Sequence, residues 1–384
     1  MRGCIRKRGK SWCIIVDIGH DENGKRKQKW FSGYPTKKEA EKDVARVVSE
    51  IDNGTFIQTT NITLGQFIQA WLSDYGKIKL SPKTYERYSG IAKLRVIPWL
   101  GNIPLDKLKP IHLQGFYKRL IEEGRKDGRP GELSPATIHY HHRVIHRILE
   151  TAVKQEMVTR NVADLIELPT VAEKSKEDVA ILNEEQIRQL EKYLAPNSPY
   201  YSMIYLSVRT GLRRGELLAL KWSDVDLAKA TLQVNHSLSY TKETGLQFKA
   251  PKTKKSRRTI DISPECVTFL KQLRKSQLEN KLLLGPEYAD FNLIFCAPNG
   301  RTWHPDTISS WFTPFLKKIG LPALSFHCLR HTHASLLLKA GVDIKVISER
   351  LGHSSIRVTY DVYAHLLPGQ QSEAAAKLER LLKS

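Results

Sequence analysis

The sequence predicts a multidomain protein that is mainly α-helical and carries small β-sheets. Its 384 residues correspond to roughly two or three domains. Apolar residues recur at helical spacing through most of the chain, whereas β-rich runs are short and occur near the N-terminus and in the second half. Polar and turn-forming segments between these regions divide the chain into an N-terminal, a helical and a C-terminal part.

Residues 1–57 predict a three-stranded sheet backed by one helix. The β-rich run Trp12–Ile18 is followed by a turn signal, and Lys25–Phe31 supplies a further strand with cations interleaved. Thr36 and Glu39 have the spacing of a capping box, so a helix is expected to begin there.

The predicted N-terminal sheet is strongly basic. A small basic sheet on one helix suits the reading of a DNA groove by strands, although a solvated basic face is the plainer interpretation. The residues expected to contact DNA here are Arg8, Lys10, Lys27 and Lys29.

Residues 62–165 predict an all-helical domain. Thr63 and Gln66 form a capping box that begins an amphipathic helix. Prolines at first helical positions indicate further helix starts, at Pro82, Pro110 and Pro135.

The helix predicted over residues 135–156 is rich in histidine. Its apolar stripe defines a buried side, so His139, Arg143 and His146 should point away from the core, and Arg143 is a candidate DNA contact. His142 and His146 have a spacing that could hold a metal ion. Because no carboxylate or cysteine is seen to complete such a site, we predict no metal.

A polar segment, residues 169–180, is expected to link this domain to the C-terminal domain, residues 181–384. Asn183 should cap the first helix there, after which helices alternate with a short strand group. The clearest strands predicted are Thr231–Ser239 and Arg257–Ile262.

Charge and cysteine usage narrow the function. The formal net charge of +21 favours a polyanionic partner, for which nucleic acid is the usual choice; a merely basic protein is the alternative. The five cysteines form no CxxC pair, which argues against a disulfide framework or a zinc finger and fits a reducing cytosol. With no apolar signal region or membrane-length apolar run, a soluble intracellular protein is expected.

The C-terminal domain holds candidates for phosphodiester chemistry without metal. Such chemistry needs a nucleophile, cations to neutralise the phosphate oxygens, and an acid for the leaving oxygen. Arg213 should open a helix, where phosphate is attracted, and Glu216 can face back to fix it. A plain surface pair is the alternative for these two residues.

His327 and Arg330 lie three residues apart, which places them side by side on a helix where both can grip one phosphate. His331 gives His327 a metal-like spacing as well, but the glutamate of zinc proteases is missing. His353 follows an amphipathic helix and could be a simple polar cap. Tyr363 and Tyr360 compete as nucleophile, and nearby cations should lower the cost of ionising the phenol.

In order and spacing these motifs resemble the tyrosine recombinases, the phage-integrase family. The resemblance rests on TGLRRGE at residues 210–216, HCLRH at 327–331, LGH at 351–353 and the Tyr-x-His pattern that selects Tyr363 over Tyr360. It implies catalytic roles for Arg213, Glu216, His327, Arg330, His353 and Tyr363.

The resemblance also implies a general-acid lysine in a Lys-Thr context on a hairpin. The basic run at residues 249–258 lies between two predicted strands, and it offers Lys252, with Lys254 as the alternative. As phosphate anchors of the same run we expect Lys254, Lys255 and Arg257 to contact DNA.

By resemblance, the C-terminal domain is an α+β tyrosine-recombinase domain that cleaves and rejoins DNA through a 3′-phosphotyrosine, without cofactor or metal. Double-stranded DNA would be bound at arm-type sites by residues 1–57 and at core-type sites by residues 62–165. The chain would act as a tetramer on DNA, coupled through the apolar stripe of its tail at residues 370–384. A tail folded back on its own domain is the alternative.

The biological role implied is integration or excision of a prophage or mobile element. Family members of this layout occur in temperate phages and integrative elements of Gram-positive bacteria, act at the host nucleoid in the cytoplasm, and work with DNA-bending and excisionase proteins. Two other functions stay open: an inactive DNA-binding regulator on the same scaffold, and a type IB topoisomerase-like enzyme.

Overall fold

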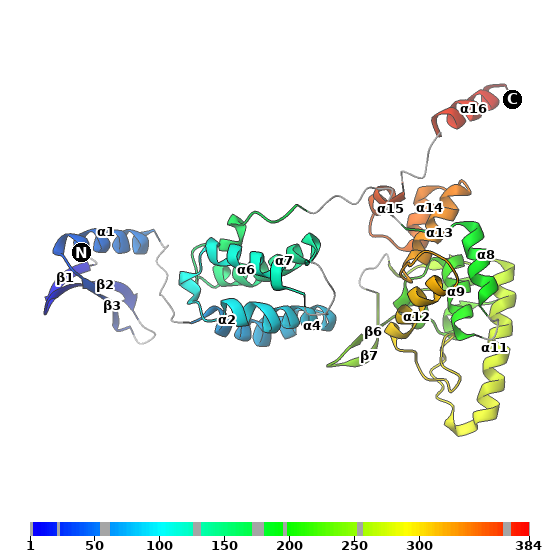
Figure 1. Ribbon diagram of the computed structural model, residues 1–384, viewed down its shortest axis with the longest axis horizontal. Helices are drawn as coiled ribbons and strands as arrows, with labels where there is room; N and C mark the ends of the chain where they lie inside the picture. Colours follow the sequence, from blue (N-terminus) through cyan, green and yellow to red (C-terminus); the bar gives the residue numbers. More distant parts are fainter. Residues whose placement is uncertain are drawn as a thin grey trace. The chain divides into compact units, whose positions relative to one another are not determined.

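The computed structural model describes residues 3–20, 24–53, 62–125, 132–170, 180–194, 198–251, 256–363 and 370–383. The chain divides into two compact units, Met1–Val171 and Ala172–Ser384 (Figure 1). The predicted linker at residues 169–180 falls largely outside the described residues, so the domain boundaries stay predictions.

An antiparallel sheet in the order β1-β2-β3 forms the start of the first unit, with one helix against it (Figure 1). Ile14 and Val16 of the central strand pack on Ala40 and Val47 of the helix. Thr36 caps that helix by accepting the amide N–H of Glu39. The predicted sheet with one helix is therefore confirmed. The elements are β1 (Gly3–Arg8), β2 (Ser11–His20), β3 (Arg26–Tyr34) and α1 (Lys37–Asp52).

Strand register separates the two faces of this sheet. Ile5, Ile14 and Phe31 are aligned across the strands and belong to the core against α1. Neighbouring residues point to the opposite face, because side chains alternate along a strand. Arg8 and Trp30 lie on that open face, where Trp30 is 51% exposed.

The helical part of the first unit has one continuous apolar core, which includes Leu64, Phe67 and Ile145. The indole N–H of Trp71 in η1 donates to the hydroxyl of Thr151 in α7 at 2.8 Å, a contact between the beginning and the end of this helical part. Helices begin at each predicted proline and at the Thr63–Gln66 capping box. The elements are α2 (Leu64–Ala70), η1 (Trp71–Gly76), α3 (Lys77–Lys79), α4 (Pro82–Ile91), η2 (Ala92–Val96), α5 (Ile97–Leu100), η3 (Leu105–Lys107), α6 (Pro110–Glu123), α7 (Pro135–Lys154) and η4 (Val162–Leu165).

Helix α7 buries its predicted apolar side and leaves Arg143 exposed. Two histidines of its outward side each have a hydrogen-bond partner. His139 bonds the carbonyl of Pro169 at 2.9 Å, and His146 contacts Asp164 at 2.7 Å. A carboxylate does therefore lie beside a histidine here, contrary to the sequence argument, because Asp164 comes from η4, which follows α7 in the chain. Among the described residues, no group of three or more side chains suited to a metal ion is present.

The second unit combines helices with two small sheets, in the orders β4-β5-β8 and β6-β7. Its main core includes Leu206, Leu217 and Phe312. Asn183 caps the first helix as predicted. The helices are α8 (Glu184–Tyr193), α9 (Pro199–Thr210), α10 (Arg214–Leu218), η6 (Trp222–Asp224), α11 (Pro264–Leu284), η8 (Gly285–Glu287), α12 (Pro305–Lys318), α13 (Cys328–Lys339), α14 (Ile344–Leu351), α15 (Ile356–Tyr363) and α16 (Gln370–Lys383). The strands are β4 (Val225–Asp226), β5 (Thr231–Gln233), β6 (Ser237–Thr241), β7 (Gly245–Lys249) and β8 (Thr259–Asp261).

The strand predictions for this unit are partly wrong. The run Thr231–Ser239 is split between β5 and β6, which belong to different sheets. At the break, Asn235 donates its side-chain N–H to Asp224 at 2.8 Å. The basic run at residues 249–258 is not a hairpin turn either, because β7 pairs with β6 while β8 pairs with β5. The β-propensity of a segment can predict that it forms a strand, but it does not predict which strand it pairs with.

Within the described ranges, no helix is both long and apolar enough to span a membrane.

Candidate active site

Arg213 stands where two helices of the second unit meet. Helix α9 ends at Gly211, whose φ of 65° is left-handed, and Arg213 is the residue before α10. The Arg213 guanidinium donates to Glu216 at 2.7 Å, and the Arg213 amide N–H donates to the same carboxylate at 3.0 Å. The predicted pair is therefore formed.

Glu216 has a second partner that the sequence argument did not single out. Arg258 donates to its carboxylate at 2.9 Å, and both side chains are nearly buried. Burial alone would raise the pKa of Glu216, but Arg258 and Arg213 outweigh it and hold the pKa below the ordinary value. Arg258 belongs to the basic run at residues 249–258, whose many cations gave no reason to choose it.

Arg330 is buried to 3% exposure on α13. It donates to the carbonyl of Gly211 at 2.8 Å and to that of Leu351 at 2.6 Å. These carbonyls lie at the C-terminal ends of α9 and α14, where helices leave acceptors unsatisfied and attract cations. Burial, followed by the charge of Arg213, lowers the pKa of Arg330 to about 9, which leaves it cationic at neutral pH.

Arg213 uses the same helix end. Its guanidinium also donates to the carbonyl of Gly352 at 3.2 Å. Both predicted arginines thus converge on the end of α14.

The two predicted histidines flank these arginines. His327 is exposed just before α13, and the protein atoms around it, with the charges of Arg330 and Arg213, lower its pKa. His353 follows α14, with its Nδ1 2.8 Å from the hydroxyl of Thr359. Burial, then Arg330 and Arg213, lowers the pKa of His353 to about 4, so its imidazole is neutral.

Tyr363 and Tyr360 lie in opposite surroundings on α15. Tyr363 is 2% exposed and Tyr360 is 56% exposed. The Tyr363 hydroxyl lies 2.7 Å from Nδ1 of His331. The charge of Arg330 lowers the pKa of Tyr363, as expected of a nearby cation, but burial has the larger effect and raises this pKa to about 12.

Four residues of the basic run remain outside the described part of the chain. They include the candidate acids Lys252 and Lys254, and the candidate DNA contact Lys255. Arg257, next to Arg258, is exposed. It lines an open pocket of about 510 Å³ together with Arg258, Lys345 and His353.

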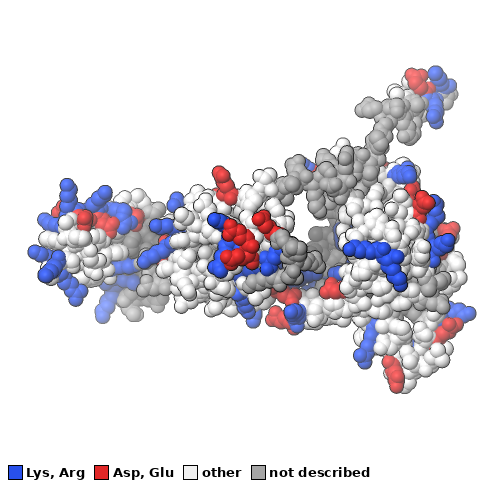
Figure 2. Space-filling view, viewed as in Figure 1, with Lys and Arg blue, Asp and Glu red and all other residues white. Residues whose placement is uncertain are grey.

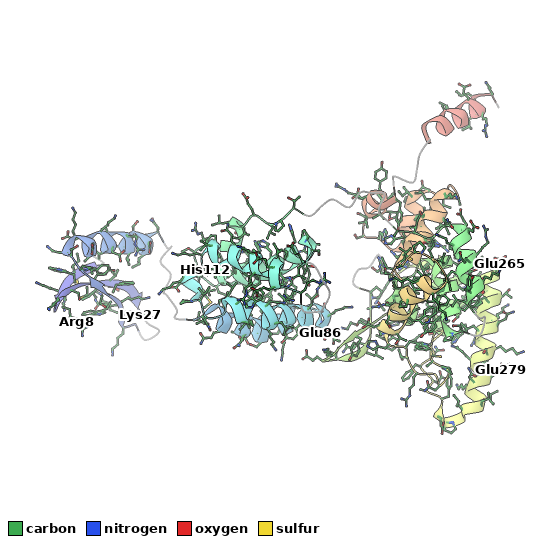
Figure 3. The ribbon with its side chains drawn as sticks, in the orientation of Figure 1. Arg8, Lys27, Glu86, His112, Glu265 and Glu279 are labelled. Carbon is green, nitrogen blue, oxygen red and sulfur yellow. The ribbon has the colours of Figure 1, made fainter. Side chains whose placement is uncertain are left out.

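The N-terminal sheet carries the other predicted contacts on β1, β3 and the turn between β1 and β2. Arg8, Lys10 and Lys27 are exposed. Arg8 and Lys27 are labelled in Figure 3, and cationic side chains are numerous on this part of the surface (Figure 2). Arg8 is on the open face of the sheet. Lys29 lies on the helix side, with its ammonium 5.6 Å from the ring centre of Phe31.

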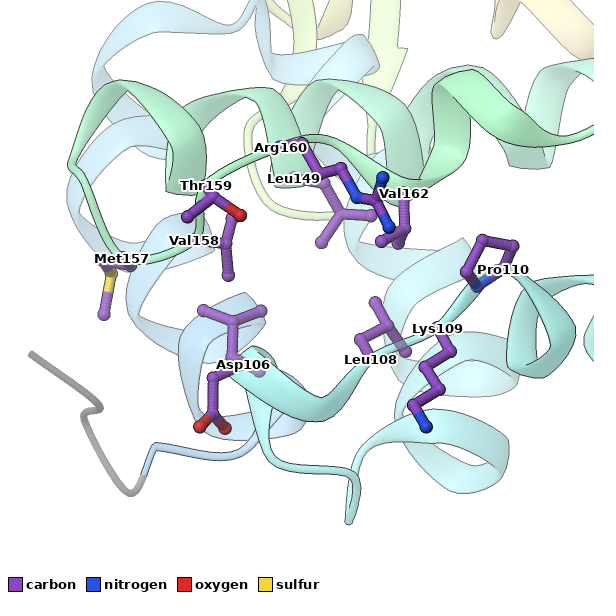
Figure 4. Close-up of a pocket in the computed structure, with 11 residues that line it drawn as sticks. Asp106, Leu108, Lys109, Pro110, Leu149, Met157, Val158, Thr159, Arg160 and Val162 are labelled. Atoms are coloured by element: carbon purple, nitrogen blue, oxygen red, sulfur yellow. The ribbon is translucent and has the colours of Figure 1, made fainter. Parts of the chain in front are cut away.

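A further pocket belongs to the helical part of the first unit (Figure 4). Its volume is about 320 Å³, and its walls come from residues 105–110 and from the end of α7 with the segment after it. The lining is mainly apolar, with Lys109 and Arg160 among it, and contains none of the predicted site residues.

The arrangement in the second unit can bind a phosphate and present a phenol near it. Two fixed guanidinium groups, two histidines and a tyrosine come from four separate segments of the chain. Three models of known families match this chain. Residues 180–369 match the phage integrase family, residues 63–121 the N-terminal SAM-like domain of phage integrases, and residues 4–51 an arm DNA-binding domain.

A tyrosine recombinase XerC-like protein of Caldanaerobacter subterraneus subsp. tengcongensis is 30% identical over 98% of this chain and 97% of its own length. The chain belongs to the phage integrase family. It is a tyrosine-type site-specific recombinase. The ICEBs1 integrase of Bacillus subtilis is also similar, at 28% identity over 90% of this chain and 91% of its own.

Solved recombinase structures share the fold of this integrase-family chain. The Tn1549 transposon integrase, solved in complex with a circular intermediate DNA, aligns with a TM-score of 0.67 and 23% identity over 83% of this chain and 99% of its own. A lambda integrase dimer bound to a core site aligns with a TM-score of 0.57 and 18% identity over 93% of each chain. The predicted mainly helical, multidomain architecture with small sheets is confirmed.

Proposed function

We propose that Tyr363 is the nucleophile with which this recombinase cleaves DNA. Its oxygen attacks the scissile phosphorus, a 3′-phosphotyrosine forms, and the P–O bond to the 5′ oxygen breaks. The bond energy is kept in the phosphotyrosine, so a 5′-hydroxyl of a second strand can reverse the step without ATP. The observation that carries this proposal is the convergence of Arg213, Arg330 and His353 around the helix that bears Tyr363.

The remaining roles follow from chemistry and position. Arg213 and Arg330 stabilise negative charge on the phosphate oxygens as the transition state forms. Glu216 positions Arg213, and His327 and His353 donate further hydrogen bonds to the phosphate. Lys252, or Lys254, protonates the leaving 5′ oxygen. Neither a metal ion nor a cofactor takes part.

The basic surfaces are proposed to bind double-stranded DNA. Residues 1–57 would bind an arm-type site through Arg8, Lys10, Lys27 and Lys29, and residues 62–165 a core-type site with Arg143. Lys254, Lys255 and Arg257 would hold the backbone near the scissile phosphate. Support comes from the net charge of +21 and from the match to an arm DNA-binding domain at residues 4–51.

Assembly on DNA is proposed to be tetrameric. A lambda integrase structurally similar to this chain was solved as a tetramer bound to a Holliday junction. Helix α16 exposes Leu378, Leu381 and Leu382, and we propose that this stripe docks on a neighbouring protomer. We further propose DNA-bending and excisionase proteins as accessory partners, and action at the nucleoid of a bacterial host on a prophage or mobile element.

A nicked suicide DNA substrate tests the proposal. Cleavage beside the nick releases a short oligonucleotide, rejoining is prevented, and a covalent protein–DNA adduct should accumulate for the wild type. An inactive regulator would bind the same DNA without an adduct. A topoisomerase-like enzyme would relax an unrelated supercoiled plasmid, which this recombinase should leave supercoiled.

A further inference from the structure

His331 contacts the proposed nucleophile, and it is not among the residues proposed to bind the phosphate or to protonate the leaving oxygen. Its Nδ1 lies 2.7 Å from the Tyr363 hydroxyl, well within hydrogen-bond distance. It stands on α13 directly after Arg330 and faces α15, so two helices must dock for this contact to form.

The surroundings of His331 favour its neutral form. The ring of His327 lies 4.9 Å away between ring centres, Arg330 is adjacent, and His353 is also close enough to interact. Burial, then His327 and Arg330, lowers the pKa of His331 to about 4. A neutral imidazole accepts through one nitrogen only. Because Tyr363 holds its own proton tightly, the hydroxyl donates and Nδ1 accepts.

We propose that His331 is a further catalytic residue, the general base that takes the phenolic proton from Tyr363 during strand cleavage. This inference rests on the proposed role of Tyr363. As the phenolic oxygen bonds to phosphorus, its O–H bond breaks and an N–H bond forms at Nδ1. The 5′ oxygen leaves with a proton from the separate acid. In rejoining, a 5′-hydroxyl attacks and returns its proton to the separate acid, and Tyr363 departs with the proton held by His331.

A base is needed because the free phenolate is scarce. With the pKa of Tyr363 at about 12, only about one molecule in 10⁵ is ionised at pH 7, since each pH unit is a factor of ten. Binding of the phosphate brings negative charge to Arg330 and His327, which otherwise disfavour a proton on His331. The DNA complex therefore raises the proton affinity of His331 when it is required.

The alternative is that His331 is a latch that keeps Tyr363 docked and inactive. The two roles make opposite predictions for a variant that cannot accept a proton. We would replace His331 with Asn and with Ala in the full chain, and use His112→Asn, the same chemical change on α6, as the matched control. Thermal melting would show that each variant folds.

Cleavage of a suicide substrate gives the first readout. A general base is worth roughly 10²- to 10⁴-fold, so both His331 variants should form adduct slower by that factor, while His112→Asn matches the wild type. A rate equal to or above the wild type would exclude the base and, if faster, establish the latch.

The pH dependence gives the second readout. In the wild type His331 takes the phenolic proton already at pH 7, so the cleavage rate should change little between pH 7 and 9. In His331→Asn the phenol must ionise by itself, so the rate should rise about tenfold per pH unit. Parallel profiles would contradict the proposal.

A substrate with sulfur in place of the bridging 5′ oxygen distinguishes the role of the general base from that of the general acid. A thiolate leaves without a proton, so Lys252→Ala and Lys254→Ala, whichever is the acid, should regain activity on it. His331→Asn should stay slow. Rescue of His331→Asn would place this residue on the leaving-group side. Failure of the proposed function itself looks different, since an adduct would then persist in Tyr363→Phe.

Discussion

The arginines of the second unit and the cations of the N-terminal sheet carry the same charge in opposite surroundings. Arg330 is 3% exposed and fixed by two helix-end carbonyls, whereas Arg8 and Lys27 are exposed on strands. A fixed cation acts on developing charge without reorganising. An exposed cation attracts a backbone in a salt-dependent way. The comparison separates residues expected to set the rate from residues expected to set the affinity.

The largest effect should come from Tyr363→Phe. Removing the hydroxyl should abolish cleavage and leave DNA binding near the wild type, because phosphate and base contacts elsewhere carry the affinity. The suicide substrate and a mobility-shift titration measure the two properties. Tyr360→Phe is the control on the same helix, and it should cleave as the wild type does.

Loss of either fixed arginine should come next. Arg213→Ala and Arg330→Ala should each slow cleavage about 100-fold or more, the scale for one transition-state charge donor. Arg330→Ala should also lower stability by about 1–3 kcal/mol, because buried carbonyls lose their donor. Single-turnover rates and thermal melts distinguish the two effects. Wild-type cleavage by either variant would remove that arginine from the site.

Glu216→Gln should have a smaller effect on cleavage than either arginine change, since Glu216 acts by positioning. The folded-state pKa of Glu216 is depressed, so its ionised form stabilises the fold above the ordinary glutamate range. That stabilisation should vanish as pH falls through the depressed value. The difference in melting temperature between wild type and variant should therefore be smaller at pH 3 than at pH 7. An equal difference at both would contradict the charge argument.

The exposed cations should affect binding alone. Arg8→Ala should reduce the slope of log affinity against log salt by about 0.9, the value for one lost phosphate contact, with cleavage of a core-site substrate unchanged. Lys42→Ala on α1 is the matched control, because Lys42 is an exposed cation outside the proposed set of DNA contacts; its slope should change less. Deletion of residues 1–57 should abolish binding to a second, arm-type site.

Removal of metal ions should leave the cleavage rate unchanged. Cleavage should proceed equally well in excess EDTA, because arginine charges and histidine hydrogen bonds are expected to stabilise the phosphate in place of a metal. Activity lost on chelation and restored by Mg²⁺ or Zn²⁺ would instead point to the histidines as ligands.

Local signals predicted the starts of several helices and one contact of the candidate site. Capping at Thr36, Thr63 and Asn183 and the proline starts were found as expected. So was the pairing of Arg213 with Glu216, because residues three apart at a helix start are brought together by the helix itself.

Contacts between distant segments could not be predicted in this way. Arg258 reaches Glu216 from 42 residues away, and His331 reaches Tyr363 from 32. The splitting of Thr231–Ser239 between two sheets was missed for the same reason, because strand partners are chosen by tertiary packing. The raised pKa of Tyr363 could not be predicted either, because it depends on burial by residues that are distant in the sequence.

The most direct test of the central claim is to find the atom that holds the DNA. The adduct trapped on a suicide substrate would be digested with nuclease and trypsin, and the peptide that follows Arg357 fragmented in a mass spectrometer. That peptide contains both Tyr360 and Tyr363. We expect the nucleotide remnant on Tyr363, from an adduct formed in excess EDTA. A remnant on Tyr360, or on a residue outside this peptide, would contradict it.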